Sequence, residues 1–372
     1  MRSSTRELND VILGGSFTRE LIVDVMHGTE PVLKNLPLTG WSIRANLGAD
    51  VKLSGTATCV YTDDNGLPFA PSGSNGVLSP YRARLMLKMR ISAGDFSEDV
   101  LIGWGRVVKT PGAKDYWSDE ILGERRVTSS VVPIEWSGLE YDIQRTGFTF
   151  PTPAGPAAWA ELAKISGLPV TRNVPDVPIP ANTVWEAKQG GRLEAVHKIA
   201  ALLSGRAMVT PMGALMVAPN RLPDKPALTL ETGVNGTITA IDSDISIDGV
   251  YNEVAGLYEV GEDRTPIHSV ARITTGPLAV GGLFGTATMY HDSDMVTSQE
   301  SADKATQAVL DESIGSQTYR VQVQCITNPL IETNDFVEVR GKDRTVRGRV
   351  VEYELSDSAL MSITLQVPMA IA

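Results

Sequence analysis

The first third of the chain alternates hydrophobic and polar residues in short runs, the pattern of strands that bury one face. In the segment FTRELIVDVMHG, Leu21, Val23 and Val25 fall on one face of a half-buried strand that stops at Gly28. In LSPYRARLMLKMRIS, leucine and methionine occupy one face, and arginine and lysine lie near the other. Turn sequences such as DDNG and SAGD separate these runs. The pattern predicts an antiparallel β-domain, either a small barrel or a sandwich.

The middle of the chain has helical periodicity between stretches that are rich in proline. A short helix is predicted in AAWAELAKIS, just after Pro156. The segment RLEAVHKIAALLSGRAMVTPMGALMVAP (192–219) then carries an apolar stripe at helical spacing, formed by Leu193, Val196, Ile199, Ala200 and Leu203. We expect Gly205 to end this helix, and AMV and ALMVAP to pair through TPMG as a hairpin that covers it.

The last third of the chain predicts one helix followed by further strands. A capping box of Thr297 and Glu300 begins the helix in TSQESADKATQAVL. The segments TYRVQVQC, DFVEVR, RVVEYEL and SALMSITLQVP then alternate, with turns at GKDR and SDS. These patterns predict a helix packed on an antiparallel sheet or barrel.

Together the patterns predict a mainly β protein with α+β parts, in which two antiparallel β-barrel-like domains flank a mixed α/β segment. Residues 1–130 are expected to form the N-terminal barrel-like domain, completed by strands within 226–250. Residues 131–225 are expected to form an inserted α/β domain with the helix and hairpin, and residues 251–372 a helix plus the second barrel-like domain.

Composition narrows the class of protein. The formal charge of −11 and the pI of about 5.0 argue against a protein that grips nucleic acid by its phosphates, because such binding needs a basic stripe. No apolar run approaches the ~20 residues that cross a bilayer. The N-terminal segment lacks the pattern of a signal peptide, so we expect the chain to be made and to fold in a cytoplasm. Cys59 and Cys325 match no metal spacing and lie in strand-like segments, which predicts two buried thiols.

The histidines do not form a catalytic or metal-binding pattern. His27, His197, His268 and His291 are scattered, and none has a partner at ligand spacing. His197 lies beside the apolar stripe of its helix, without an H-x-x-x-H or H-E-x-x-H companion. We therefore interpret it as a histidine at the margin of a helix, without a catalytic role.

Three polar or glycine-rich segments are candidate ligand sites. The sequence HDSD (291–294) could hold a divalent ion but also suits a polar loop ahead of a helix. Asp242, Asp244 and Asp248 superficially resemble a calcium loop, yet the isoleucines between them alternate as in a strand. The segment GGLFG (281–285) has no lysine and is interpreted as a flexible loop. No metal or cofactor site is predicted.

The sequence also allows two specific functions, a hydrolase and a glycan-binding module. Asp119 and Glu120 beside Trp117 could act as the paired acids of a hydrolase for cell wall or surface glycan. Trp41, Trp104 or Trp117 could instead recognise glycan in a module that binds a host receptor.

The order of the segments carries a resemblance that no single motif does. GSFTRELIVDVMHG, NLPLTGWSI, VKLSGTATCVYTD and LSPYRARLMLKMRI follow one another at the N-terminus, and the LxxIAxLxG helix with its hairpin comes next. YNEVAGLYEV, VGGLFGTATMY and TSQESADKATQAVL then lead to NPLIETNDFVEVR, an N-P-x-[LI]-x-x-x-D approach to a strand. This order resembles the baseplate hub, or tail-tip minor tail, proteins of tailed bacteriophages, particularly the long-tailed phages of actinobacteria.

The resemblance implies a structural virion protein rather than an enzyme. Hubs of this family form a ring of three copies, and their two barrels per chain give pseudo-sixfold symmetry that fits the hexameric tube. The implied homotrimer joins the tail tube and distal tail proteins to the central fibre or spike and meets the end of the tape measure protein. It surrounds the DNA exit channel without specific DNA binding or stable membrane insertion. The implied location is the virion tail tip, after assembly in the host cytoplasm.

Overall fold

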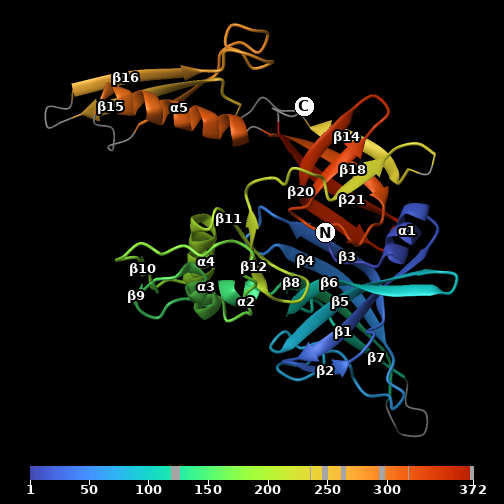
Figure 1. Ribbon diagram of the computed structural model, residues 1–372. Coiled ribbons are helices and arrows are strands. Elements are labelled where there is room, and N and C mark those ends of the chain that lie inside the picture. The colour runs from blue at the N-terminus through green and yellow to red at the C-terminus, as the bar shows by residue number, and fades with distance from the viewer. Residues whose placement is uncertain are drawn as a thin grey trace.

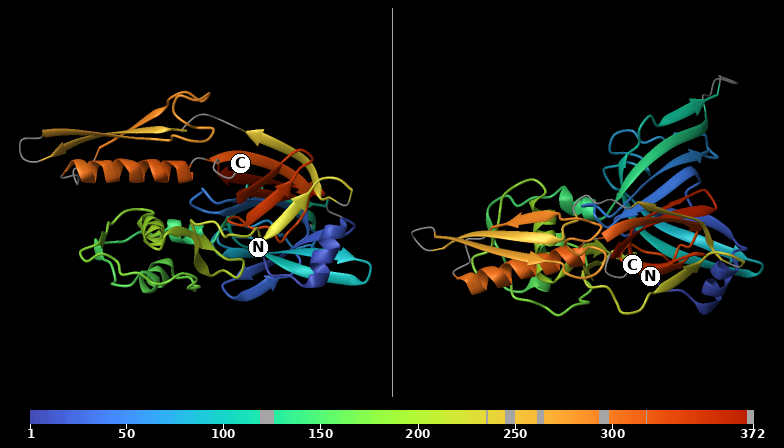
Figure 2. Two further views of the ribbon diagram at one scale, coloured as in Figure 1. Left: turned by 45° about the horizontal axis from the view of Figure 1, so that its top comes forward. Right: turned by 90° about the horizontal axis from the view of Figure 1, so that it is seen from above.

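The computed structural model describes the chain except for residues 119–125, 235, 245–249, 261–264, 293–297, 317 and 369–372. Figure 1 shows three parts, which we call the body, the module and the arm. The body comprises residues 1–138, 226–244 and 318–368, the module residues 139–219, and the arm residues 251–316. Both views of Figure 2 show the module and the arm extending from the same side of the body.

The N-terminal half of the body is a set of antiparallel strands in the order β3-β4-β8-β6-β5-β1-β2, with β7 paired to β8. Their bounds are β1 Thr18–His27, β2 Glu30–Leu33, β3 Leu38–Asn46, β4 Leu53–Tyr61, β5 Ala83–Ala93, β6 Phe96–Lys109, β7 Lys114–Trp117 and β8 Val127–Gly138. The apolar side chains predicted for one face of β5 are buried, namely Leu85, Leu87 and Met89. Because β8 runs on to Gly138, a domain boundary at residue 130 would cut a strand, and the first domain ends later than predicted.

Strand β1 is buried on both faces, so the prediction of a half-buried strand is wrong for its second face. Leu21, Val23 and Val25 enter the main core as predicted. On the opposite face Asp24 is also only 7% exposed. Its carboxylate accepts a hydrogen bond of 2.8 Å from Lys88 on the paired strand β5. A salt bridge between neighbouring strands thus allows a charged residue to lie in a buried strand.

The C-terminal half of the body contains strands from two distant segments. Their bounds are β13 Leu228–Glu231, β14 Ile238–Asp244, β18 Thr318–Ile326, β19 Phe336–Arg340, β20 Thr345–Ser356 and β21 Leu360–Pro368. Strand β13 pairs in parallel with β19, and β14 pairs antiparallel with β18. The strands within 226–250 therefore complete the C-terminal half, which corrects the prediction that they complete the N-terminal domain.

The two halves form one 14-stranded sheet among the described residues, because β20 pairs with β3. The fold is mainly β and antiparallel, as predicted, with two β-units on either side of the inserted segment. The ladders between described residues leave this sheet open rather than closing it into barrels. One hydrophobic core contains residues from both halves, including Val23 and Ile134 from the first and Val323 and Leu365 from the second.

A helix near the N-terminus was not predicted. Helix α1 (Arg6–Gly14) begins at Thr5, whose side chain accepts a hydrogen bond of 3.1 Å from the Leu8 amide. It ends at Gly15, which adopts a left-handed φ of 68°. Leu8 and Ile12 are buried in the main core. The sequence carries these signals, a threonine cap, a glycine stop and an apolar pair four residues apart.

The module is a small α/β unit with its own core. Its elements are α2 Glu140–Gln144, β9 Thr152–Pro153, α3 Ala158–Ser166, β10 Val184–Trp185, α4 Gly191–Leu202, β11 Gly205–Val209 and β12 Leu215–Pro219. The predicted stripe of α4 is buried in that core, and β11 and β12 form the predicted hairpin. Gly205 does not cap α4, because Ser204 takes the left-handed conformation (φ 57°) and Gly205 begins β11.

The arm consists of a three-stranded sheet with one helix on one of its faces. Strand β15 (Glu253–Val260) lies between β16 (Thr265–Arg272) and β17 (Thr288–His291), and helix α5 spans Gln299–Ser316. Tyr258 reaches the helix and its hydroxyl lies 2.8 Å from that of Thr306. The predicted helix therefore packs on the arm and not on the C-terminal strands, so the predicted domain 251–372 comprises the arm and part of the body. Thr297 of the predicted capping box lies outside the described residues.

Candidate functional site

At the junction between the two halves of the body, two strands pair, a charged side chain is buried, and the module is attached. Strands β3 and β20 form an antiparallel ladder from Ser42 paired with Ser356 to Asn46 paired with Glu352. Arg44 on β3 forms an ion pair with Glu352 on β20. Continuous backbone hydrogen bonding of this kind fixes the register of the halves, and it aligns the surfaces that each half presents.

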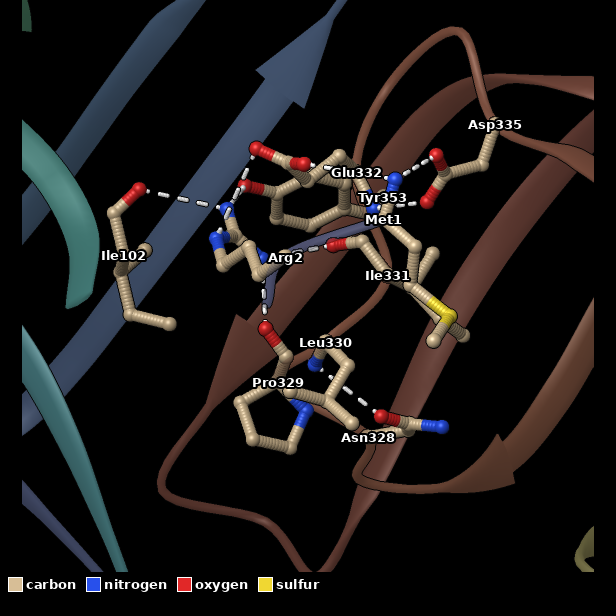
Figure 3. A network of polar contacts seen from close by, with 10 residues as sticks. All are labelled: Met1, Arg2, Ile102, Asn328, Pro329, Leu330, Ile331, Glu332, Asp335 and Tyr353. Atoms are coloured by element: carbon tan, nitrogen blue, oxygen red, sulfur yellow. Dashed lines mark hydrogen bonds and ion pairs between the residues drawn. The ribbon is translucent and has the colours of Figure 1, made fainter. Parts of the chain in front are cut away.

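Arg2 is the central side chain of this junction (Figure 3). Its guanidinium donates to the carbonyls of Pro329 (2.6 Å) and Ile331 (2.7 Å) in the C-terminal half. It also donates to the carbonyl of Ile102 on β6 (3.2 Å) and to the hydroxyl of Tyr353 on β20 (2.8 Å). One side chain, only 8% exposed, therefore links both halves of the body.

The charge of Arg2 is retained in this buried place. Burial lowers the pKa of Arg2, but Tyr353 and the carboxylate of Glu332 outweigh burial and raise the pKa above its ordinary value. The Glu332 carboxylate lies 3.8 Å from Nε of Arg2, and the guanidinium lies 5.7 Å from the ring centre of Tyr353. A buried cation of this kind is stable only when hydrogen bonds and an opposite charge replace its water.

Two of the four acceptors for Arg2 lie in the loop NPLIETND (328–335), the segment that carried the C-terminal part of the sequence resemblance. The Asn328 side chain accepts a hydrogen bond of 3.0 Å from the Leu330 amide, which shapes the turn. Asp335 accepts a hydrogen bond of 2.7 Å from the Glu332 amide, and both of these carboxylates form ion pairs with the terminal amine of Met1. The loop thus presents two of its carbonyls to Arg2.

The module is attached to the junction through a second set of polar contacts. Glu140, at the start of α2, is 4% exposed and accepts a hydrogen bond of 3.3 Å from the Val209 amide of β11. Burial raises the pKa of Glu140, although its backbone hydrogen bonds and Lys52 oppose that shift. At the other end of the module, Arg349 of β20 donates to the carbonyls of Pro219 (3.2 Å) and Asn220. The bond between Glu140 and Val209 lies within the module, whereas Lys52 of the N-terminal half interacts with Glu140 and Arg349 of the C-terminal half binds the other end. Both halves of the body therefore contact the module.

His197 lies at the same boundary. Its Nδ1 is 3.8 Å from the Asp50 carboxylate, which belongs to the loop between β3 and β4. Burial and the nearby Lys52 lower the pKa of His197, and Asp50 only partly opposes this. The histidine predicted at a helix margin is therefore placed between α4 and the body.

The other histidines are well separated from His197. His27 Nε2 lies 2.9 Å from the carbonyl of Val77, and His291 packs edge-on against Tyr258 in the arm. His268 lies on the exposed side of β16. The structure therefore brings none of the predicted histidines together.

The candidate ion sites lie in strands or loops where the structure describes them. Asp242 and Asp244 lie in β14, whereas Asp248 is outside the described residues. In HDSD, His291 ends β17, and residues 293–294 are likewise not described. Across the described chain, no group of three or more histidine, cysteine or acidic side chains is placed to hold a metal ion. In GGLFG, Gly281 and Gly285 have left-handed φ values, which is typical of a turn.

The residues of the two alternative functions are dispersed. Asp119 and Glu120 lie outside the described residues. Trp117, at the end of β7, is 53% exposed. Trp41 packs beneath the guanidinium of Arg19, and Trp104 lies under Gly213 in the turn of the β11–β12 hairpin. The structure therefore does not gather the three tryptophans into one site.

Proteins of known structure share this architecture. No known family model and no curated protein matches the sequence. A tail protein from Neisseria meningitidis MC58 matches with a TM-score of 0.58 and 12% identity, covering 94% of this chain and 97% of its own. The 43 kDa tail protein of prophage MuSo2 from Shewanella oneidensis matches with a TM-score of 0.56 and 14% identity, covering 95% and 99%. The Francisella PdpA-VgrG complex in its half-lidded form matches with a TM-score of 0.55 and 9% identity, covering 94% of this chain and 58% of that one.

At these identities the similarity establishes the fold, which is that of phage tail proteins. The predicted resemblance to tail proteins is confirmed at this level. Among the described helices, none is long and apolar enough to span a membrane. Sequence reasoning recognised the 328–335 loop by its pattern but missed Arg2, because a single arginine near a chain end carries no periodic signal.

Proposed function

We propose that this chain is a structural component of a bacteriophage tail tip and has no enzymatic activity. The observation that carries the proposal is the match to two tail proteins, one of them from a prophage, over nearly the full length of each chain. The junction supports it, because a part that transmits position between neighbours needs two halves in fixed register. A shared ladder, a shared core and the buried Arg2 provide that register.

The finer form of the proposal is a homotrimeric baseplate hub. It joins the tail tube and the distal tail protein to a central fibre or spike, meets the end of the tape measure protein, and surrounds the DNA exit channel. Two β-units in one chain give a trimer six such units, which suits a hexameric tube. The end strands β2 and β14 of the large sheet have one unpaired edge each among the described ladders, and such edges are suited to contact neighbouring subunits. The net charge of −11 disfavours adhesion of passing DNA.

The trimer is tested by light scattering coupled to gel filtration, followed by reconstruction of an assembled tail. The expected mass is three times the chain mass of 39.9 kDa, and the expected reconstruction has three copies around the channel at the tip. A different copy number, or a position away from the tip, would overturn the hub proposal. The fold match would stand in that case, since it rests on a different observation.

The non-enzymatic part is tested separately on labelled peptidoglycan and on host cells. We expect the purified protein to clear no peptidoglycan. Clearing that is lost with both Asp119→Ala and Glu120→Ala would show hydrolysis and overturn this part of the proposal.

A receptor-binding role has one observation in its favour, the exposed neighbours Tyr116 and Trp117 on β7. Under that alternative Trp117→Ala abolishes binding of the free protein to host cells, whereas Trp104→Ala leaves binding unchanged. Under the structural proposal, the free protein shows no such binding to lose.

A further inference from the structure

A cleft open to solvent lies where the module meets the body, and the assembly role proposed above does not use it. It has a volume of about 530 Å³ and lies between the β3–β4 loop, helix α4 and strand β11. The charged and polar side chains that line it are Asp50, Lys52, His197, Arg206 and Asn220. The cleft is therefore bordered by three segments distant in sequence, and its shape depends on the docking of the module.

Positive charge predominates at this cleft, in a chain whose formal net charge is −11. Lys52 and Arg206 line it from opposite sides of the boundary. Arg349 lies behind Asn220, whose carbonyl accepts one of its hydrogen bonds. Asp50 is the one carboxylate lining the cleft among the described residues.

Neither of the two cations that line the cleft, Lys52 and Arg206, forms an ion pair with a described carboxylate. The Arg206 side chain forms no ion pair or hydrogen bond with any described residue, and the Lys52 ammonium donates to the backbone carbonyl of Ala49. Burial first and then Arg206 lower the pKa of Arg349. Burial lowers the pKa of Lys52 as well, and Arg206 adds to that shift against the opposing effects of Glu140 and Asp50. The cations thus repel one another in the free protein.

Glu140 offsets part of the repulsion on Lys52, but it does not line the cleft. Its carboxyl is buried behind Lys52 and bonded to the Val209 amide. An anion from outside would therefore meet an unpaired guanidinium at the front and an ammonium beside it. Guanidinium groups bind carboxylate and phosphate oxygens in a two-pronged geometry, and charge-assisted bonds of this kind are the stronger class.

We propose that the cleft between the β3–β4 loop and strand β11 is an oxyanion-binding site for a carboxylate or phosphate group, with Arg206 and Lys52 as direct ligands. His197 lies at its border and senses the bound charge. The source of the group is either a free anion or the acidic side chains of an adjoining protein. The proposal does not rest on the tail-tip role, and it is tested on the isolated chain.

The first experiment titrates the full-length protein with inorganic phosphate and, separately, with hexaglutamate, at constant pH and ionic strength. Calorimetry reports binding, and the ring signals of selectively labelled histidines report position. We expect saturable binding with a shift confined to His197 among the four histidines. Arg206→Gln should weaken binding at least fivefold, because it removes the unpaired guanidinium. Arg221→Gln is the matched control, since the Arg221 side chain is 89% exposed, forms an ion pair with Asp224 and does not line the cleft, and it should leave binding unchanged.

The second readout is the pKa of His197. A bound anion offsets the repulsion from Lys52, so this pKa should rise when sulfate, which does not titrate in this range, is added. The Arg206→Gln protein should show a smaller rise.

Comparing the affinities for phosphate and hexaglutamate identifies the source of the anion. Tighter binding of hexaglutamate than of phosphate assigns the site to protein carboxylates, and the reverse order assigns it to a free phosphate. Absence of saturable binding of either ligand would overturn the proposal. Equal binding by the Arg206→Gln and unaltered proteins would also overturn it.

Discussion

Arg2 shows how much one buried side chain can link, because its two terminal guanidinium nitrogens donate to four fixed acceptors. The four acceptors come from one loop and two strands that are distant in sequence. None of these groups can turn toward water without disturbing the junction. The residue therefore stabilises the relative placement of the halves and not a single element.

Replacing Arg2 by alanine should lower the free energy of unfolding by about 3 kcal/mol or more, because the loss of one partner leaves buried polar groups without replacement. Arg2→Lys should recover only part of this, since one ammonium cannot reach all four acceptors. Denaturant unfolding measures both. The exposed Arg6 of α1 provides the control, and Arg6→Ala should change stability by less than about 0.5 kcal/mol. Equal effects of the two alanine variants would contradict the role given to Arg2.

Asp24 predicts a specific dependence of stability on pH. Burial raises the pKa of Asp24, but hydrogen bonds from Lys88 and the Asn35 amide outweigh burial and hold it below the ordinary value. A carboxyl with a lowered folded-state pKa contributes stability above its unfolded pKa and loses it as the pH falls through the folded value. The stability difference between the unaltered protein and Asp24→Asn should thus be full at pH 6 and shrink below pH ~4. A constant difference across this range would contradict the assignment.

The two cysteines should be unreactive in the folded protein. Cys59 and Cys325 are free and buried, as predicted, and burial raises the pKa of each thiol to about 12. Since the thiolate is the reactive form, a thiol reagent at pH 8 should label neither residue in the native state. Both should react once the protein is unfolded in denaturant. Rapid native labelling of either cysteine would show that its strand opens to solvent.

Elements of this chain follow local patterns well where a single apolar stripe decides them. The apolar stripe of α4 and the apolar face of β5 are buried as predicted. Predicting such a face requires only that it is buried, and not which element covers it. Local patterns are less informative about what lies against an element. Strand β1 gave no sign that its second face would be covered, and Gly205 was given a capping role that belongs to Ser204.

Gly205 has a packing role in the hairpin that an alanine should disrupt. An added Cβ would lie 2.4 Å from the Ala218 carbonyl oxygen and 2.5 Å from the Val217 side chain. Gly205→Ala should therefore destabilise the protein by roughly 1–3 kcal/mol through overpacking. Gly14→Ala is the matched control, because its Cβ meets nothing within 4 Å, and it should be neutral or stabilising by about 0.5 kcal/mol. Thermal unfolding of both variants checks this, and a neutral Gly205→Ala would contradict it.

At the scale of the whole molecule, the arm is an insertion between two strands that are already partners. Asp244 at the end of β14 pairs with Arg320 in β18, on either side of the arm. The arm also has small hydrophobic clusters of its own, with α5 packed on β15 and β16. The body therefore has the connectivity of a simple hairpin at this place.

Replacing residues 245–317 by a short glycine-serine turn should leave the body folded, because the β14–β18 ladder needs only a short connection. Circular dichroism and thermal unfolding should show a cooperative transition close to that of the full chain. Aggregation or loss of cooperativity would show that the arm is needed for the body to fold.

The large sheet could be predicted as a class but not as a topology. Alternation identified the strands of both halves, whereas the partners of β13 and β14 were misassigned to the N-terminal domain. Strand pairing depends on contacts between distant segments, and alternation alone does not encode the partner. The same limit applies to Arg2 and to the cleft, since each is assembled from segments that no local pattern connects.

The sequence by itself determined the mainly β class, the helix and hairpin of the module, the two buried thiols and the order of segments typical of tail proteins. The first three follow from periodicity and composition, which act over a few neighbouring residues, and the last is a resemblance to a known family. The tertiary structure alone decided that β3 and β20 merge the halves into one sheet, that Arg2 links them, and that the module and body enclose a cationic cleft. Burial and charge balance belong to the surroundings that folding creates, so they become visible only when distant segments meet.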